Sequence, residues 1–161
     1  MSVCVRQVSQ LPELGSLLAA SEREGFRFVR RLAVDFDART NRFDAEGEAL
    51  FALFDEETCV GVGGVNRDPK GAQVVGRIRR VYVLPEYRGT GAGRMLMASI
   101  ESWCAGLFAR LELYTDTSAA AGFYESQGYN AVRAAHTSHV KKLATSSATV
   151  LTLNRRETKC D

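Results

Sequence analysis

The chain has 161 residues, of which 45% are hydrophobic and 25% charged, the balance of a folded globular protein whose length fits a single domain over residues 1–161. Its net charge is only +2, from 21 basic and 19 acidic residues, so no broad basic field indicates nucleic-acid binding. No apolar run approaches the roughly 20 residues needed to span a bilayer, and the start "MSVCVRQVSQ" does not resemble a secretion signal, so we expect a cytoplasmic protein without membrane contact.

The cysteines and histidines give no pattern typical of a metal site. The four cysteines lie far apart in the sequence, and the chain has only two histidines, His136 and His139. This spacing fits neither a zinc site nor a disulfide framework. We therefore expect reduced thiols and no bound metal.

The first third of the chain predicts one strand, two helices and a hairpin. "VCVRQV" (3–8) alternates apolar and polar residues and predicts a strand. Leucines at helical spacing follow and predict a helix that stops at Gly25, and apolar residues every fourth position predict a short second helix over 26–36. Two apolar runs at 47–56 and 58–68, separated by a polar turn, predict the hairpin.

The next predicted strand, "RIRRVYVL" (77–84), has an irregular pattern. Under strict alternation Arg77 and Arg79 would share one face of the strand with two valines, which combines charge and apolar bulk. A β-bulge near Arg79 or Arg80 would reset the alternation and remove this conflict.

The remaining elements complete a mixed sheet. We expect a helix from about Arg94 to Leu107, a strand at 110–116, a helix at 118–127, and final strands at 130–137 and 148–156. The helix before 110–116 makes the fourth and fifth strands parallel, through a right-handed crossover. The expected fold is therefore α/β (α+β), with a mixed, mostly antiparallel sheet of six to seven strands flanked by about four helices.

The stretch "PEYRGTGAGR" (85–94) has glycines at alternate positions, between a predicted strand and a predicted helix. Glycine permits turns and close approach, so this loop can direct several backbone N–H groups to one point, where the helix dipole and Arg88 and Arg94 add positive charge. A surface turn would need fewer glycines, so we expect a diphosphate site. The loop lacks the lysine and hydroxyl residue of a nucleotide-hydrolase loop and the third glycine of the dinucleotide fingerprint.

Two motifs together resemble the GNAT N-acyltransferase superfamily. "RGTGAG" fits that family's acyl-coenzyme A loop, Gln/Arg-x-x-Gly-x-Gly/Ala, with Arg88, Gly91 and Gly93 at the defined positions. "SAAAGFYESQGYNAV" (118–132) is similar to its second signature, and the two segments lie one helix and one strand apart, as in the family. The resemblance implies the GNAT fold, with the fourth and fifth strands splayed around the pantetheine arm of acyl-CoA.

The resemblance also implies roles for particular residues. Backbone groups of the fourth strand would pair with pantetheine, at Val81, Tyr82 and Val83. The loop amides would hold the pyrophosphate, from Arg88, Gly89, Thr90, Gly91, Ala92, Gly93 and Arg94. At the start of the second signature, the hydroxyl of Thr117 or Ser118 could contact the thiol end. Tyr124 matches the family's general acid, which would reprotonate the thiolate leaving group.

The sequence departs from the family pattern at two positions. Arg77 stands where many members have a glutamate as general base, and arginine cannot accept a proton, so a water relay or a carboxylate of Glu48, Glu112 or Asp116 must replace it. Thr117 stands where asparagine is frequent, and either Thr117 or Ser118 could instead cap a helix.

The function implied by the resemblance is acetyl transfer from acetyl-CoA to a primary amine of a small molecule or protein by direct attack, since no cysteine lies near the motifs to act as nucleophile. The alternative is a non-catalytic acyl-CoA-binding module that serves as a sensor or interaction protein. The acceptor wall would lie at about 26–43. Arg77, Arg79 and Arg80 near the cleft mildly favour an anionic acceptor, but a solvated face explains them better. A terminal strand at 148–154 could pair with a second copy in a homodimer.

Overall fold

The computed structural model describes residues 2–69 and 74–144, and its elements follow the predicted order through the first four strands. In chain order they are β1 (Val3–Val8), α1 (Gly15–Arg23), α2 (Phe28–Asp37), β2 (Ala49–Asp55), β3 (Thr58–Arg67), β4 (Val75–Val83), the short 3₁₀ helix η1 (Pro85–Tyr87), α3 (Ala92–Cys104), β5 (Arg110–Leu113), α4 (Ser118–Ser126), β6 (Asn130–Ala134) and β7 (Thr137–Lys142).

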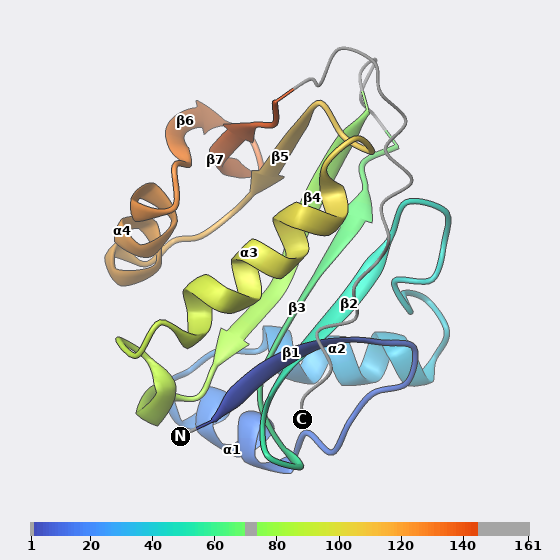
Figure 1. Ribbon diagram of the computed structural model, residues 1–161, viewed down its shortest axis with the longest axis vertical. Coiled ribbons are helices and arrows are strands. Elements are labelled where there is room, and N and C mark those ends of the chain that lie inside the picture. The colour runs from blue at the N-terminus through green and yellow to red at the C-terminus, as the bar shows by residue number, and fades with distance from the viewer. Residues whose placement is uncertain (1, 70–73, 145–161) are drawn as a thin grey trace.

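The seven described strands form one sheet in the order β1-β2-β3-β4-β5-β7-β6. All neighbouring pairs are antiparallel except β4 and β5, which are parallel, as expected from the helix that joins them. Figure 1 shows α3 across one face of the sheet and α1 and α2 on the opposite face. The predicted mixed, mostly antiparallel sheet with four helices is confirmed.

The core lies where the helices cover β2, β3 and β4. Six of the seven residues of β2 are buried, as are eight of the ten residues of β3. Both amphipathic helices bury one face: Val29, Leu32 and Phe36 on α2, and Leu96, Met97, Ile100 and Cys104 on α3. Burial of these stripes fixes both helices against the sheet that carries the site.

The end of the described chain differs from the prediction. The single strand expected at 130–137 is wrong, because β6 ends at Ala134 and β7 begins at Thr137. His136 adopts a positive φ of 63° in the turn between them, although the turn has no glycine. The strand expected at 148–156, and with it the proposed pairing at 148–154, lies outside the described residues.

None of the helices within residues 2–69 and 74–144 is long and apolar enough to cross a membrane. That the chain forms a single domain stays a prediction.

Candidate active site

The parallel pair β4 and β5 separates after a short region of contact. Their pairing runs from Val75 opposite Arg110 to Arg77 opposite Glu112 and then ends. β4 continues to Val83, and β5 ends at Leu113. Residues 78–83 of β4 therefore extend past their last β5 partner and leave an edge of backbone groups that a ligand can pair with.

A β-bulge in β4 resolves the irregular sequence pattern as predicted. Tyr82 pairs with Val62 and Arg79 with Gly64, so Arg80 and Val81 together oppose the single residue Gly63. Arg80 has a φ of 61°, which marks the distorted point.

The bulge places the side chains of β4 on opposite faces. A Cβ built on Gly63 would lie 3.1 Å from Val81 and 3.1 Å from Ile100 of α3, so Val81 faces α3. Tyr82 instead packs its ring against Phe26 and Phe28, with ring centroids 6.5 and 5.9 Å away, beside α1 and α2.

The glycine loop has the backbone geometry that an anion site needs. Gly89 and Gly91 have φ values of 73° and 90°, and a Cβ at either would meet nothing within 4 Å. Gly91 is the N-cap of α3, so the amides of Gly93 and Arg94 lie in the first helical turn without an intrahelical partner. Thr90 Oγ1 donates to Tyr87 O at 2.5 Å and accepts from the Ala92 amide at 3.4 Å. The two glycines thus permit the turn, and the first turn of α3 leaves amide groups without an intrahelical partner, as an anion site requires.

Gly93 has a different role from the other two loop glycines. Its φ is not in the left-handed region, but a Cβ there would lie 3.3 Å from the ring of Phe123 on α4 and 3.9 Å from Val83. Gly93 therefore permits close packing between α3, α4 and β4, whereas Gly89 and Gly91 permit the turn.

The side chain of Arg88 turns away from the loop and anchors the α1–α2 connection. Its two terminal nitrogens donate to Glu24 at 2.7 and 2.8 Å, and its Nε donates to Val83 O at 2.9 Å. Glu24 also accepts from Tyr82 Oη at 2.5 Å. The charge of Arg88 is thus paired with the Glu24 carboxylate in this structure, and its contribution to a diphosphate site stays a prediction.

This cluster shifts the pKa of each of its members. Burial, and then the hydrogen bond to Glu24, raises the pKa of Tyr82 to about 12. The Arg88 guanidinium lowers the pKa of Glu24, and Glu24 raises that of Arg88. Sequence reasoning missed Glu24 because its partners are about 60 residues away. Arg94, in contrast, is exposed at the start of α3 and remains a candidate for phosphate contact.

Tyr124 lies on α4 and is 7% exposed. Its ring packs edge-on against Phe123 and Tyr129, with centroids 5.2 and 5.6 Å away. Its hydroxyl makes no hydrogen bond to another described residue. The Trp103 indole nitrogen also lacks a partner and is fully buried, whereas the Tyr124 hydroxyl is not among the fully buried polar atoms without a partner. Burial raises the pKa of Tyr124, so the phenol is protonated at neutral pH and can donate a proton.

The two hydroxyls at the start of α4 differ. Thr117 is the N-cap, and its Oγ1 accepts from the Ala120 amide at 3.2 Å, which confirms a capping role. Ser118, the first residue of α4, is exposed.

The side chain of Arg77, at the position of the family's glutamate base, instead connects β4 with β5 and β7. Its guanidinium donates to Thr137 Oγ1 at 2.9 Å and to the carbonyl of His136, and lies 4.0 Å from Glu112. Glu112 also accepts from Arg110 at 2.9 Å. The Glu112 carboxylate therefore lies beside two arginines.

The other two carboxylates considered as bases differ in their partners. Glu48 accepts from the Asn66 side chain and the Arg67 amide, both at 3.0 Å. Asp116, between β5 and α4, is exposed and has no hydrogen bond or ion pair to another described residue.

The cysteines offer no activated thiol among the described residues. Cys59 and Cys104 are free and buried, and burial raises their pKa values to about 11 and about 12. Cys4 is disulfide-bonded, so the expectation of reduced thiols is wrong for this residue. No group of three or more His, Cys, Asp or Glu side chains in residues 2–69 and 74–144 could hold a metal.

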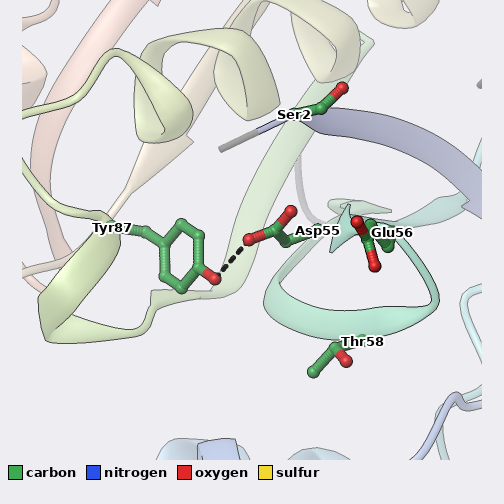
Figure 2. A pocket seen from close by; sticks show the side chains of 5 residues that line it. All are labelled: Ser2, Asp55, Glu56, Thr58 and Tyr87. Carbon is green, nitrogen blue, oxygen red and sulfur yellow. Dashed lines mark hydrogen bonds between the residues drawn. The ribbon is translucent and has the colours of Figure 1, made fainter.

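Two surface hollows among the described residues are lined by none of residues 78–83 or 110–113. Figure 2 shows one of them, lined by Ser2, Asp55, Glu56, Thr58 and Tyr87, where Tyr87 Oη donates to Asp55 at 2.6 Å. Its two carboxylates make it unsuitable for a phosphate. A second hollow, beside α2, is lined by Gln10, Leu11, Ala33, Val34, Phe36, Asp37 and Arg42. The backbone geometry of the loop, rather than a deep cavity, therefore identifies the candidate site.

Comparison with known families identifies the class of protein. The model of the acetyltransferase (GNAT) family matches residues 15–129, which include the glycine loop and Tyr124. The chain belongs to the GNAT acetyltransferase family.

Individual relatives agree with this assignment. The chain is 32% identical over 75 residues to the N-alpha-acetyltransferase RimI of Mycobacterium tuberculosis; this match covers 47% of the chain and about half, 48%, of that relative. A crystal structure described as an acetyltransferase from Exiguobacterium sp. 255-15 is 31% identical, with a TM-score of 0.80 over 88% of this chain and 94% of the other.

A more distant structure shares the fold alone. The PaiA N-acetyltransferase of Thermoplasma acidophilum, solved in complex with coenzyme A, is 16% identical, with a TM-score of 0.59 over 88% of this chain and 99% of the other.

Proposed function

We propose that the chain transfers the acetyl group of acetyl-CoA to a primary amine, of a small molecule or a protein, by direct attack of the amine on the thioester. The observation that carries the proposal is the end of β4–β5 pairing at Arg77, which leaves residues 78–83 of β4 open and continuous with the glycine loop.

The open strand and the loop supply complementary binding groups for the donor. The main chain of Val81, Tyr82 and Val83 would pair with the amide groups of pantetheine, as an added strand does. The amides of the loop from Arg88 to Arg94 would hold the pyrophosphate. Those of Gly93 and Arg94 lie in the first turn of α3 without an intrahelical partner, whereas those of Arg88 and Ala92 already donate to Pro85 O and Thr90 Oγ1. Ser118 and Thr117, at the start of α4, are placed as candidates for contact with the thiol end.

Tyr124 would act as the general acid. In the transfer, the amine nitrogen bonds to the thioester carbon, the carbon–sulfur bond breaks, the amine loses a proton, and the sulfur must gain one. The Tyr124 hydroxyl is protonated and makes no hydrogen bond to another described residue, so it can supply the proton to sulfur. Burial makes this phenol a weaker acid, but a thiolate formed in the same desolvated cleft becomes a stronger base for the same reason.

The amine proton requires a different acceptor. Arg77, Glu48 and Glu112 are committed to other contacts, so we assign this role to water or to Asp116.

The Tyr124→Phe substitution tests the proposal, measured as thiol release from acetyl-CoA over a panel of amines. We expect kcat to fall about tenfold to a hundredfold, with little change in KM for acetyl-CoA, because only proton donation is lost. Tyr114→Phe is the matched control, since Tyr114 is 61% exposed. Wild-type turnover by Tyr124→Phe would exclude the acid role.

One observation favours a second candidate function, a non-catalytic acyl-CoA-binding module. The family's glutamate base is replaced by Arg77, whose side chain is tied to β7. Calorimetric binding of acetyl-CoA without turnover on any amine would favour the module over the enzyme.

A further inference from the structure

Three arginines lie close together on β4 where β5 departs, and their surroundings differ. Arg77 contacts Thr137 and Glu112, and Arg80 lies 3.8 Å from Asp35 of α2. Arg79, between them, makes no hydrogen bond or ion pair with any residue that the structure describes. Among the described residues, it is the member of the three that has no carboxylate in ion-pair contact.

The side chain of Arg79 faces the side of the sheet on which the acceptor wall is expected. Arg79 pairs with Gly64, and residues directly opposite in an antiparallel pair share a face. A Cβ on Gly64 would lie 2.6 Å from the ring of Phe43, which belongs to the segment after α2. Arg79 therefore lies on the face that α2 and residues 38–48 cover, opposite α3.

Charged groups of both signs surround Arg79. Partial burial, and then the charge of Arg77, lowers the pKa of Arg79; burial, followed by Arg79 and Arg31, lowers that of Arg80. Two nearby carboxylates, Asp68 and Glu48, act in the opposite direction, and Glu48 is bonded to the neutral Asn66 amide and the Arg67 backbone amide. Neither carboxylate forms an ion pair with Arg79 among the described residues, so its guanidinium can still bind an anion.

We propose that Arg79 binds an anionic group of the acceptor, so that the preferred substrate is a small primary amine that also carries a carboxylate or phosphate. This inference rests on the proposed acetyl transfer and adds the chemical class of the acceptor. Arg79 lies two residues before Val81 on the same strand, and the planar guanidinium with free N–H groups suits either anion. An acceptor amine without an anionic group could not form this ion pair with Arg79, so Arg79 would not strengthen its binding.

Matched acceptors test the proposal. β-Alanine is compared with its neutral carboxamide, and phosphoethanolamine with ethanolamine, as kcat/KM at saturating acetyl-CoA. We expect the anionic member of at least one pair to be favoured about tenfold to a hundredfold, and the pair that shows the preference identifies the anion. Arg79→Gln should remove the preference through KM of the acceptor, leave KM for acetyl-CoA unchanged, and leave the neutral amines at their wild-type rates.

Two variants serve as controls. Arg67→Gln makes the same change in net charge at an exposed residue that alternation places on the other face of the sheet, and it should retain the preference. Arg79→Lys keeps the charge without the planar donor pair and should retain part of it.

The outcomes separate the two proposals. Equal turnover of the charged and neutral members, or a preference that survives in Arg79→Gln, overturns the role of Arg79 while acetyl transfer stands. Turnover of no amine, with acetyl-CoA still bound, overturns acetyl transfer itself.

Discussion

The two halves of the sheet on either side of the β4–β5 opening are built differently. β2 and β3 are almost wholly buried between helices, whereas all five residues of β6 are exposed. The half formed by β5, β7 and β6 pairs with β4 at three positions in the described chain, and its residues Leu111 and Leu113 are buried in the same apolar core. The half that contains β2 and β3 is thus the more deeply buried one, and the short β4–β5 pairing leaves room for a ligand beside the other.

The largest expected effect on stability lies in the apolar half. Leu53 of β2 is fully buried, so Leu53→Ala should lower the free energy of unfolding by about 2–5 kcal/mol, through lost burial and the cavity left behind. Denaturant unfolding measures this. The dissociation constant for acetyl-CoA of the folded fraction should not change; a large change would show that the two halves are not separable.

The glycine loop should show the opposite behaviour. Gly91→Val forces a β-branched residue to a φ of 90°, which costs on the order of 1–3 kcal/mol locally and displaces the amides of α3. We expect binding of acetyl-CoA to be abolished in calorimetry while the cooperative unfolding transition remains. A folded variant with unchanged affinity would contradict the assignment of the loop.

The smallest effect concerns the Glu24–Arg88 contact and its dependence on pH. Because Arg88 lowers the pKa of Glu24 below its usual value near 4.5, the stabilisation is complete above that value and is lost as the pH falls through the lowered pKa. The melting temperature of Glu24→Gln should therefore lie slightly below wild type at pH 6, and the difference should shrink toward pH 3. A difference in melting temperature that does not depend on pH would mean that the stabilisation does not come from the charge of Glu24.

The sequence predicted those features whose cause is local. The bulge at Arg80 could be expected because charged and apolar residues would otherwise share a face, and the turn glycines Gly89 and Gly91 because few other residues tolerate positive φ. The hairpin of β6 and β7 was missed because its turn has no glycine and because β7 buries Thr137 and His139, which inverts the expected alternation.

The contacts of the arginines could not be predicted in the same way. Arg88 meets Glu24 across 64 residues, and Arg77 meets Thr137 across 60. Such pairings depend on the arrangement of the whole sheet, so a sequence motif shows only that an arginine is present and not which group neutralises it.

The bulge in β4 also changes how densely a strand can present side chains. A regular strand directs only every second residue to a given face. Here Arg79 faces the α2 side by its pairing with Gly64, and its neighbour Arg80 reaches Asp35 on α2. One inserted residue therefore places two consecutive side chains, Arg79 and Arg80, on the same face. Substitutions at these two positions can change neighbouring contacts on that face without changing the path of the strand that follows.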